Sequence, residues 1–152
     1  MIITFVGHRT LCKENGLQER VKMSLIESIR LGEKTIFYCG GYGDFDNLCA
    51  TVCHSIKKIC TDCEIVFVTP YISISQQKKI KRLIEEKTYD SVIYPPLETV
   101  PQRLAICKRN EWMIEQADLV LAYVDCNYGG AYKALQYATK KGKRIINLAN
   151  YN

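Results

Sequence analysis

The sequence predicts an α/β fold, in which helices cover both faces of a parallel sheet, and three observations lead to it. Six short runs are rich in apolar and β-branched residues and have the length of strands. These runs are almost continuously apolar, which is typical of strands buried on both faces. Longer segments with helical spacing separate most of them, and parallel neighbouring strands require such crossovers.

The predicted elements alternate along the chain, beginning with a strand. The strand-like runs are IITFV (2–6), TIFYC (35–39), EIVFV (64–68), SVIY (91–94), LVLAYV (119–124) and RIINL (144–148). The first predicted helix, 17–31, makes one apolar stripe from residues four apart, namely Leu17, Val21, Leu25 and Ile29. Further helices are predicted over 44–59, 75–86, 101–117 and 130–141. Because no linker, repeat or low-complexity segment interrupts this alternation, residues 1–152 are expected to form a single domain.

The composition fits one globular domain with a substantial core. Of the 152 residues, 47% are hydrophobic and 24% are charged. No segment approaches the roughly 20 apolar residues that span a bilayer. The N-terminal MIITFVGHR also lacks the basic start and long apolar stretch of a secretory signal. We therefore expect a cytoplasmic protein with no membrane partner.

The charge balance is modestly basic, with a net charge of +5 from 21 basic and 16 acidic residues. Much of the excess lies in QQKKIKRLIEEK (76–87) and KKGKR (140–144). Solvated helix faces and cationic helix ends explain these runs better than a nucleic-acid footprint does. Nucleic acid is therefore not the expected partner, and a homo-oligomer is left open.

The eight cysteines are expected to be free thiols and not disulfides. Most of them fall in or beside predicted strands and helices, and the chain is large enough to fold without disulfide bonds. Cys60 and Cys63 form a C-x-x-C motif, but no second pair follows at zinc-like spacing. Small buried residues are the favoured interpretation, so no metal site is expected. No cofactor is expected either, because G-x-G-x-x-G beginning at Gly41 would need a glycine where Asp46 stands.

The first glycine loop raises the question of a ligand. In open parallel sheets a ligand lies outside the carboxyl ends of the strands, near the point where the strand order reverses. The stretch FYCGGYGDFDNLC occupies such an end, and Gly40, Gly41 and Gly43 would let a ligand approach main-chain N–H groups. Asp44 and Asp46 have two interpretations of equal weight, as N-cap and dipole complement or as partners of ribose hydroxyls or a base. Two carboxylates would repel a phosphate at this place.

The second glycine pair favours phosphate instead. NYGGAYK (127–133) opens the last predicted helix with Gly129 and Gly130, places Lys133 about one turn in, and is followed by no acidic residue. Free N–H groups at an acid-free helix start, with a lysine nearby, suit an anion. The alternative is a tight strand-to-helix turn whose lysine is solvated.

Four more polar residues are candidates for the same rim of the sheet. Arg109 and Asn110 lie on a predicted helix, and for Arg109 an anion or ribose contact and a surface salt bridge have equal weight. His8 and Arg9 directly follow the first predicted strand. His8 also suits a capping or partly buried position.

The order FVGHR, YCGGYGDFD, RNEWMIEQADLVLAYV and GGAYKALQYATKKGKRIINL resembles the SLOG superfamily over most of the chain, and in particular its small stand-alone bacterial members. That superfamily includes the lonely-guy phosphoribohydrolases, DNA-processing protein A, which binds single-stranded DNA, and sensor domains for cyclic ADP-ribose derivatives. The resemblance implies a Rossmann-like fold with a nucleotide-derived small molecule held between the two glycine loops.

The catalytic residues of the lonely-guy enzymes are matched only in part. Arg109 and Met113 keep the spacing of R-K-x-x-M, although Asn110 replaces its lysine. Lys133 stands where the motif P-G-G-x-G-T-x-x-E has its glutamate. An ammonium cannot replace a carboxylate that stabilises a developing cation or acts as a base.

The leading hypothesis is therefore a sensor or sequestering module for a nucleotide derivative. An enzyme that hydrolyses or transfers an N-glycosidic bond is one alternative, and Asp44, Asp46 or Asp125 would then supply the carboxylate that deoxyribosyltransferase-like chemistry requires. A single-stranded nucleic-acid binder is the other alternative, which an aromatic groove beside the basic runs would favour.

Overall fold

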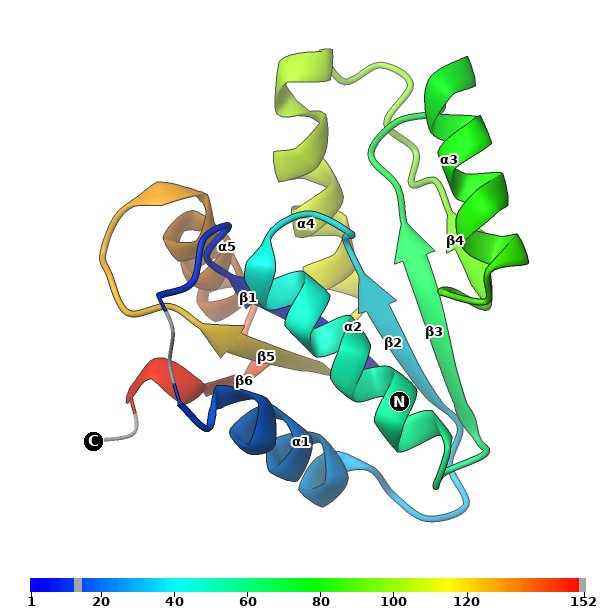
Figure 1. Cartoon of the computed structure of the whole chain (residues 1–152). Helices are drawn as coiled ribbons and strands as arrows, with labels where there is room; N and C mark the ends of the chain where they lie inside the picture. The colour runs from blue at the N-terminus through cyan, green and yellow to red at the C-terminus, as the bar shows by residue number, and fades with distance from the viewer. Residues whose placement is uncertain (13–14, 151–152) are drawn as a thin grey trace.

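The computed structural model describes residues 1–12 and 15–150, and a six-stranded sheet lies at its centre (Figure 1). All strand pairs are parallel, and the strand order is β4-β3-β2-β1-β5-β6. The strands are β1 (Ile2–Gly7), β2 (Thr35–Cys39), β3 (Cys63–Val68), β4 (Ser91–Ile93), β5 (Leu119–Tyr123) and β6 (Arg144–Asn147). Each corresponds to one of the predicted runs, so the predicted α/β class is confirmed.

The helices also follow the predicted order, with small shifts at their ends. They are α1 (Leu17–Ser28), α2 (Asp44–Lys57), α3 (Ile74–Glu85), α4 (Ala105–Gln116) and α5 (Gly129–Lys140). The helix predicted over 17–31 ends early, because Ile29 adopts an extended conformation with ψ of 132°. The helix predicted over 101–117 begins with a 3₁₀ turn, Gln102–Leu104, in which the Leu104 N–H bonds to the Pro101 carbonyl. In the part of the chain that the structure describes, no helix is long and apolar enough to cross a membrane.

Alternate side chains of the strands pack against helices on opposite faces of the sheet. On one face, Phe5 and Phe37 stack with ring centroids 6.3 Å apart, and α1 and α2 cover them. The other face packs against α4 and α5 through the buried side chains Val6, Ile114, Val120, Ala122, Ala134 and Ala138. Figure 1 shows the resulting three layers, with α1 and α2 in front of the sheet and α5 behind it.

Asp90, just before β4, ties the sheet to α2. Its Oδ2 accepts the Ile65 N–H at 2.8 Å, and its Oδ1 pairs with the ammonium of Lys57. Burial by itself would raise the pKa of Asp90, but the amide and the ammonium outweigh it and hold the pKa below the ordinary value of 3.8.

Thr35, at the start of β2, has a buried hydroxyl. Its Oγ1 makes no hydrogen bond among the described residues.

All eight cysteines are free thiols. In the C-x-x-C motif, Cys63 is 5% exposed, and burial together with the adjacent Cys60 thiol raises the pKa of Cys63 to about 12. The interpretation of this motif as ordinary packing agrees with its surroundings.

Candidate functional site

A cleft of about 290 Å³ opens at the carboxyl edge of the sheet, where β1 ends. The chain places β2, β3 and β4 on one side of β1 and places β5 and β6 on the other side, so the strand order reverses between β1 and β5. The connections that follow these two strands leave in opposite directions, and ligands of open α/β sheets bind in the crevice that results.

Both glycine loops reach this cleft, the first through Gly40 and the second through Gly130. The other predicted site residues that line it are His8, Arg9, Asp46, Arg109 and Asn110. The predicted residues that lie outside its lining are Gly41, Gly43, Asp44, Gly129 and Lys133. Tyr42 and Ala131 also line the cleft, and the sequence analysis did not single them out.

The first glycine loop wraps around a carboxylate of its own chain. The N–H groups of Gly40 and Gly41 both donate to the Asp46 carboxylate, the former at 3.1 Å. Gly41 has a φ of +72°, and a Cβ atom there would lie 2.5 Å from the ring of Phe67. Burial raises the pKa of Asp46, while the Gly40 amide opposes the shift. Internal packing therefore accounts for these glycines, and the amides expected to face a ligand hold Asp46 instead.

Arg109 is a buried tie between α4 and the ends of two strands. Its side chain is 2% exposed, and Nη1 donates to the carbonyl oxygens of Gly40 and Val68, both at 2.6 Å. Gly40 permits this approach, because a Cβ atom there would lie 2.9 Å from the guanidinium. Nε donates to Asn110 Oδ1 at 2.9 Å. Burial lowers the pKa of Arg109, whereas the charge of Asp46 opposes that shift. The interpretation of Arg109 as a surface salt-bridge residue is therefore wrong.

Asp44 fastens the loop that follows β1 to the start of α2. Its N–H donates to the Arg9 carbonyl at 2.8 Å, and its Oδ2 accepts the Leu11 N–H at 2.9 Å. The N-cap of α2 is Gly43, which makes no side-chain capping bond. Asp44 is therefore the first residue of the helix and not the expected N-cap, and its carboxylate bonds to the loop that follows β1.

The second glycine loop is open where the first is filled. Tyr128 is the N-cap of α5 and makes no side-chain capping bond, and the first turn of α5 has no acidic residue. Cβ atoms placed on Gly129 or Gly130 would meet no heavy atom within 4 Å. Lys133 lies on the same helix and is exposed. The Cβ positions of both glycines therefore face open space, and Gly130 lies at the wall of the cleft.

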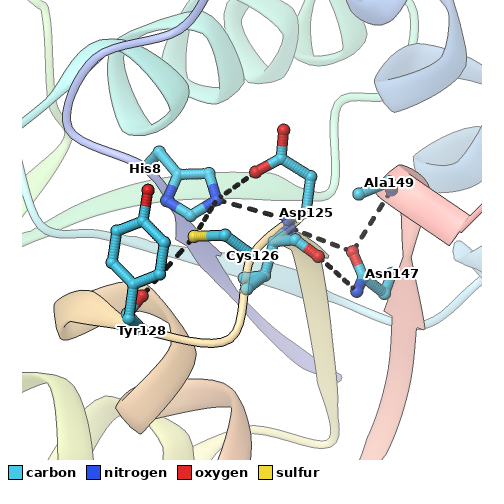
Figure 2. Close-up of polar contacts among 7 residues, drawn as sticks. His8, Asp125, Cys126, Tyr128, Asn147 and Ala149 are labelled. Atoms are coloured by element: carbon cyan, nitrogen blue, oxygen red, sulfur yellow. Dashed lines mark hydrogen bonds and ion pairs between the residues drawn. The ribbon is translucent and has the colours of Figure 1, made fainter.

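His8 turns toward the loop that follows β5 (Figure 2). Its Nε2 lies 2.8 Å from Asp125 Oδ1 and 3.8 Å from Cys126 Sγ, and it also receives the Asp125 N–H at 3.2 Å. From the sequence, Asp125 was expected only as an alternative carboxylate for catalysis, and Cys126 was not among the candidate site residues. Asp125 and Cys126 directly follow β5. This position would have predicted a contact with His8 only if β5 had been known to lie beside β1.

The chain matches no protein-family model, and a search of curated proteins finds no match. Among solved structures it is similar to DNA processing protein A from Helicobacter pylori, which is described as having a unique single-stranded DNA binding mode. The TM-score is 0.59 at 14% sequence identity. The match covers 95% of this chain and 63% of that chain, so this chain spans less than two thirds of the length of its neighbour. At this identity the likeness shows the fold, which is Rossmann-like.

The comparison corrects one expectation drawn from the sequence. The modest charge excess set nucleic acid aside as a partner, but the structural neighbour of the same fold binds single-stranded DNA. A small basic excess is compatible with such binding, because a few correctly placed cations and aromatic rings suffice to hold a single strand. Nucleic acid therefore has to be considered.

Proposed function

We propose that this protein is a SLOG-type module that binds a nucleotide-derived small molecule in the cleft at the end of β1. One observation carries the proposal: the acid-free start of α5 opens, at Gly130, onto the same cleft as His8, Arg9 and Asn110. The first N–H groups of a helix have no intrahelical acceptor, and the helix dipole attracts an anion. A phosphate at this wall would meet these amides and the nearby charge of Arg9.

The opposite wall of the cleft suits the rest of a nucleotide. Asn110 and the partly buried Asp46 offer polar groups for sugar hydroxyls. Tyr42 adds an aromatic ring to the lining of the cleft, and the Arg109 guanidinium lies 5.6 Å from its centroid. A volume of about 290 Å³ is small for a ligand pocket and matches one nucleotide unit better than a dinucleotide.

The proposal revises the role of Lys133. This residue is exposed and outside the cleft lining, so the first amides of α5 and Arg9 take the direct phosphate contacts. Lys133 then acts from the next turn as a solvated charge that attracts the anion at longer range.

Calorimetric titration with AMP and with adenosine tests the proposal. We expect AMP to bind at least about tenfold more tightly than adenosine, because only AMP carries the group that the helix start attracts. Chromatography of the same mixtures should detect no free adenine above a control without protein. Equal affinities for AMP and adenosine would refute the phosphate site, and rapid adenine release would make the protein an N-glycosidase.

Single-stranded DNA binding is a second candidate, and a specific arrangement favours it. Tyr42 lines the cleft with Lys79 Nζ 5.2 Å from its ring centroid, and Tyr128 at the start of α5 is 73% exposed. Aromatic rings beside cations are what a single strand uses for base stacking and phosphate contacts. The structural neighbour, which binds single-stranded DNA, has the same fold.

Fluorescence anisotropy with a labelled oligothymidine distinguishes this candidate from the first. If a strand binds, Tyr42→Ala should weaken binding by about 1–3 kcal/mol, Tyr42→Phe should keep it, and affinity should fall steeply with salt. If AMP binds and the oligonucleotide does not, the small-molecule function stands alone.

A further inference from the structure

Three potential metal ligands meet at the point where the strand order reverses. His8 follows β1, while Asp125 and Cys126 follow β5, and these two strands are parallel neighbours with Gly7 opposite Tyr123. One ligand atom from each of the three residues lies within 4.8 Å of the other two. No other group of this kind occurs among the residues that the structure describes.

The contacts converge on a single nitrogen of His8, as Figure 2 shows. Nε2 lies 2.8 Å from the Asp125 carboxylate and 3.2 Å from the Asp125 amide nitrogen. If Nε2 carries a proton, the Asp125 N–H points at another N–H. If Nε2 carries a lone pair, that lone pair faces a carboxylate oxygen at 2.8 Å. No protonation state of the ring satisfies both contacts, whereas a cation on the Nε2 lone pair would bind the carboxylate as well and leave the Asp125 N–H to water.

The same convergence argues against a catalytic triad. In a Cys-His-acid triad the thiol and the acid occupy opposite ring nitrogens, so that one nitrogen takes the proton while the other is oriented. Here Cys126 Sγ lies 3.8 Å from Nε2, the nitrogen that also faces Asp125. Ligands of one metal ion converge in this way, because each directs a lone pair at a common point.

We infer that His8, Asp125 and Cys126 form a binding site for a divalent cation of the zinc class. Nitrogen, sulfur and carboxylate oxygen are the donors that zinc takes, at bond lengths of about 2.0–2.3 Å. Tetrahedral geometry then places ligand atoms about 3.3–3.6 Å apart, so the sulfur is already near its place and the carboxylate has to retreat by about 0.5 Å. The Asp125 side chain is 58% exposed and is free to make that adjustment, and water can then accept its N–H.

The surroundings hold the donors in place. Asn147 of β6 clamps the residue before Asp125, because its Nδ2 donates to the Val124 carbonyl at 3.0 Å and its Oδ1 accepts the Val124 N–H at 3.1 Å. The ring of Tyr123 meets the His8 ring edge-on at a centroid distance of 6.5 Å. These contacts fix the backbone that leads to Asp125 and one edge of the His8 ring.

The site would leave one coordination position open. Three protein ligands and one exchangeable position are the arrangement of catalytic zinc, in which water or a ligand anion occupies the fourth place. Because His8 also lines the cleft, the open position would border the space proposed for a nucleotide. No metal site was expected from the sequence, where only the C-x-x-C motif at Cys60 and Cys63 was weighed. His8 lies 118 residues from Cys126, and only the strand order brings the two together.

Cobalt titration of the purified, metal-stripped protein tests the inference. We expect saturation at one ion per chain, with a thiolate-to-cobalt charge-transfer absorption that zinc abolishes by displacement. Cys126→Ser should remove this absorption, and Asp125→Asn and His8→Gln should weaken cobalt binding by at least about tenfold. Cys60→Ser is the matched control, because it removes a thiol of the other cysteine cluster, and it should leave the absorption unchanged.

Circular dichroism establishes that each variant is folded, and the exposed Asp125 keeps the test decisive if His8→Gln does not fold. Absence of saturable cobalt binding to the wild-type protein would overturn the inference. So would an absorption that survives Cys126→Ser and disappears in Cys60→Ser. Neither result depends on nucleotide binding, so the metal site stands or falls separately from the proposed function.

Discussion

Placing a carboxylate at Gly130 tests whether the start of α5 binds phosphate. Gly130 is exposed, its φ is not in the left-handed region, and a Cβ atom there meets no heavy atom within 4 Å. Gly130→Asp therefore introduces a negative charge at the wall of the cleft without a clash at Cβ. An acidic residue in the first turn also complements the helix dipole, so the variant should fold. Gly130→Asn is the matched control, because it has the same shape without the charge.

The expected loss of affinity follows from Coulomb's law. A carboxylate at position 130 and a phosphate at the same helix start would be about 5 Å apart. At an effective dielectric constant of about 30, two unit charges at that distance repel by about 2 kcal/mol. This corresponds to a roughly 30-fold weaker binding of AMP by Gly130→Asp than by Gly130→Asn. Salt screens charges at a solvent-exposed position, so the difference should shrink as ionic strength rises.

Isothermal titration of both variants with AMP and with adenosine measures this difference. Adenosine has no phosphate, so its affinity should be the same for Gly130→Asp and Gly130→Asn. Equal AMP affinities for the two variants at low salt would refute a phosphate at the start of α5. If Gly130→Asp loses the same affinity for AMP as for adenosine, relative to the wild-type protein, the new side chain acts by blocking the cleft and not by its charge.

Three further predictions concern stability. Gly41→Ala should lower the free energy of unfolding by about 2–5 kcal/mol, because a left-handed φ and the packed ring of Phe67 both oppose the added methyl group. Gly142→Ala is the control: its φ of +65° is also left-handed but the surrounding space is open, so it should lower the free energy of unfolding by only about 1–2 kcal/mol. Thr35→Val should raise the free energy of unfolding by about 1 kcal/mol, because it removes a buried hydroxyl that has no partner among the described residues. Asp90→Asn should lower it by about 1–2 kcal/mol at pH 7, since Lys57 and a β3 amide bind the charged form. Because those contacts depress the pKa of Asp90, its stabilisation is present above the ordinary value of 3.8 and is lost as the pH falls through the folded-state value.

Urea unfolding followed by circular dichroism measures all three effects. Equal costs for the two glycine variants would contradict a close contact at Gly41. A destabilised Thr35→Val would mean that the hydroxyl has a partner in solution. If the difference between Asp90→Asn and the wild-type protein stays constant from pH 7 down to about pH 2, the charge of Asp90 plays no part in its contribution.

Local sequence patterns were sufficient to predict the elements of the fold. The stripe of Leu17, Val21 and Leu25 predicted α1, and all three residues are buried in the structure. The apolar runs predicted strands for the same reason, because periodicity records which side chains leave water whatever they pack against. Helix ends were less predictable, as α1 shows by ending at Ser28. The backbone conformation and hydrogen bonding of the last residues decide where a helix ends, and the spacing of apolar residues does not describe either of them.

The sequence led to several residues that line the cleft but not to the contacts among them. The rule that ligands lie at the carboxyl edge led to both glycine loops, and Gly40 and Gly130 do line one cleft. The sequence could not show that Asp46 fills the first loop or that Arg109 bonds to the Gly40 carbonyl, 69 residues away. A glycine that accommodates a guanidinium and a glycine that accommodates a ligand look the same in a sequence.

The sequence by itself determined the alternation of strands and helices, the burial of each face and the residues that follow each strand, because each of these depends on local spacing. Only the tertiary structure decided that β5 lies beside β1, and this placement brings His8 to Asp125 and Cys126. Strand order is a property of pairing between distant segments, and apolar runs that are buried on both faces fit beside one another almost interchangeably. The contacts of Asp125 and Cys126 with His8 Nε2 therefore depend on the pairing of β1 with β5, which no local sequence pattern specifies.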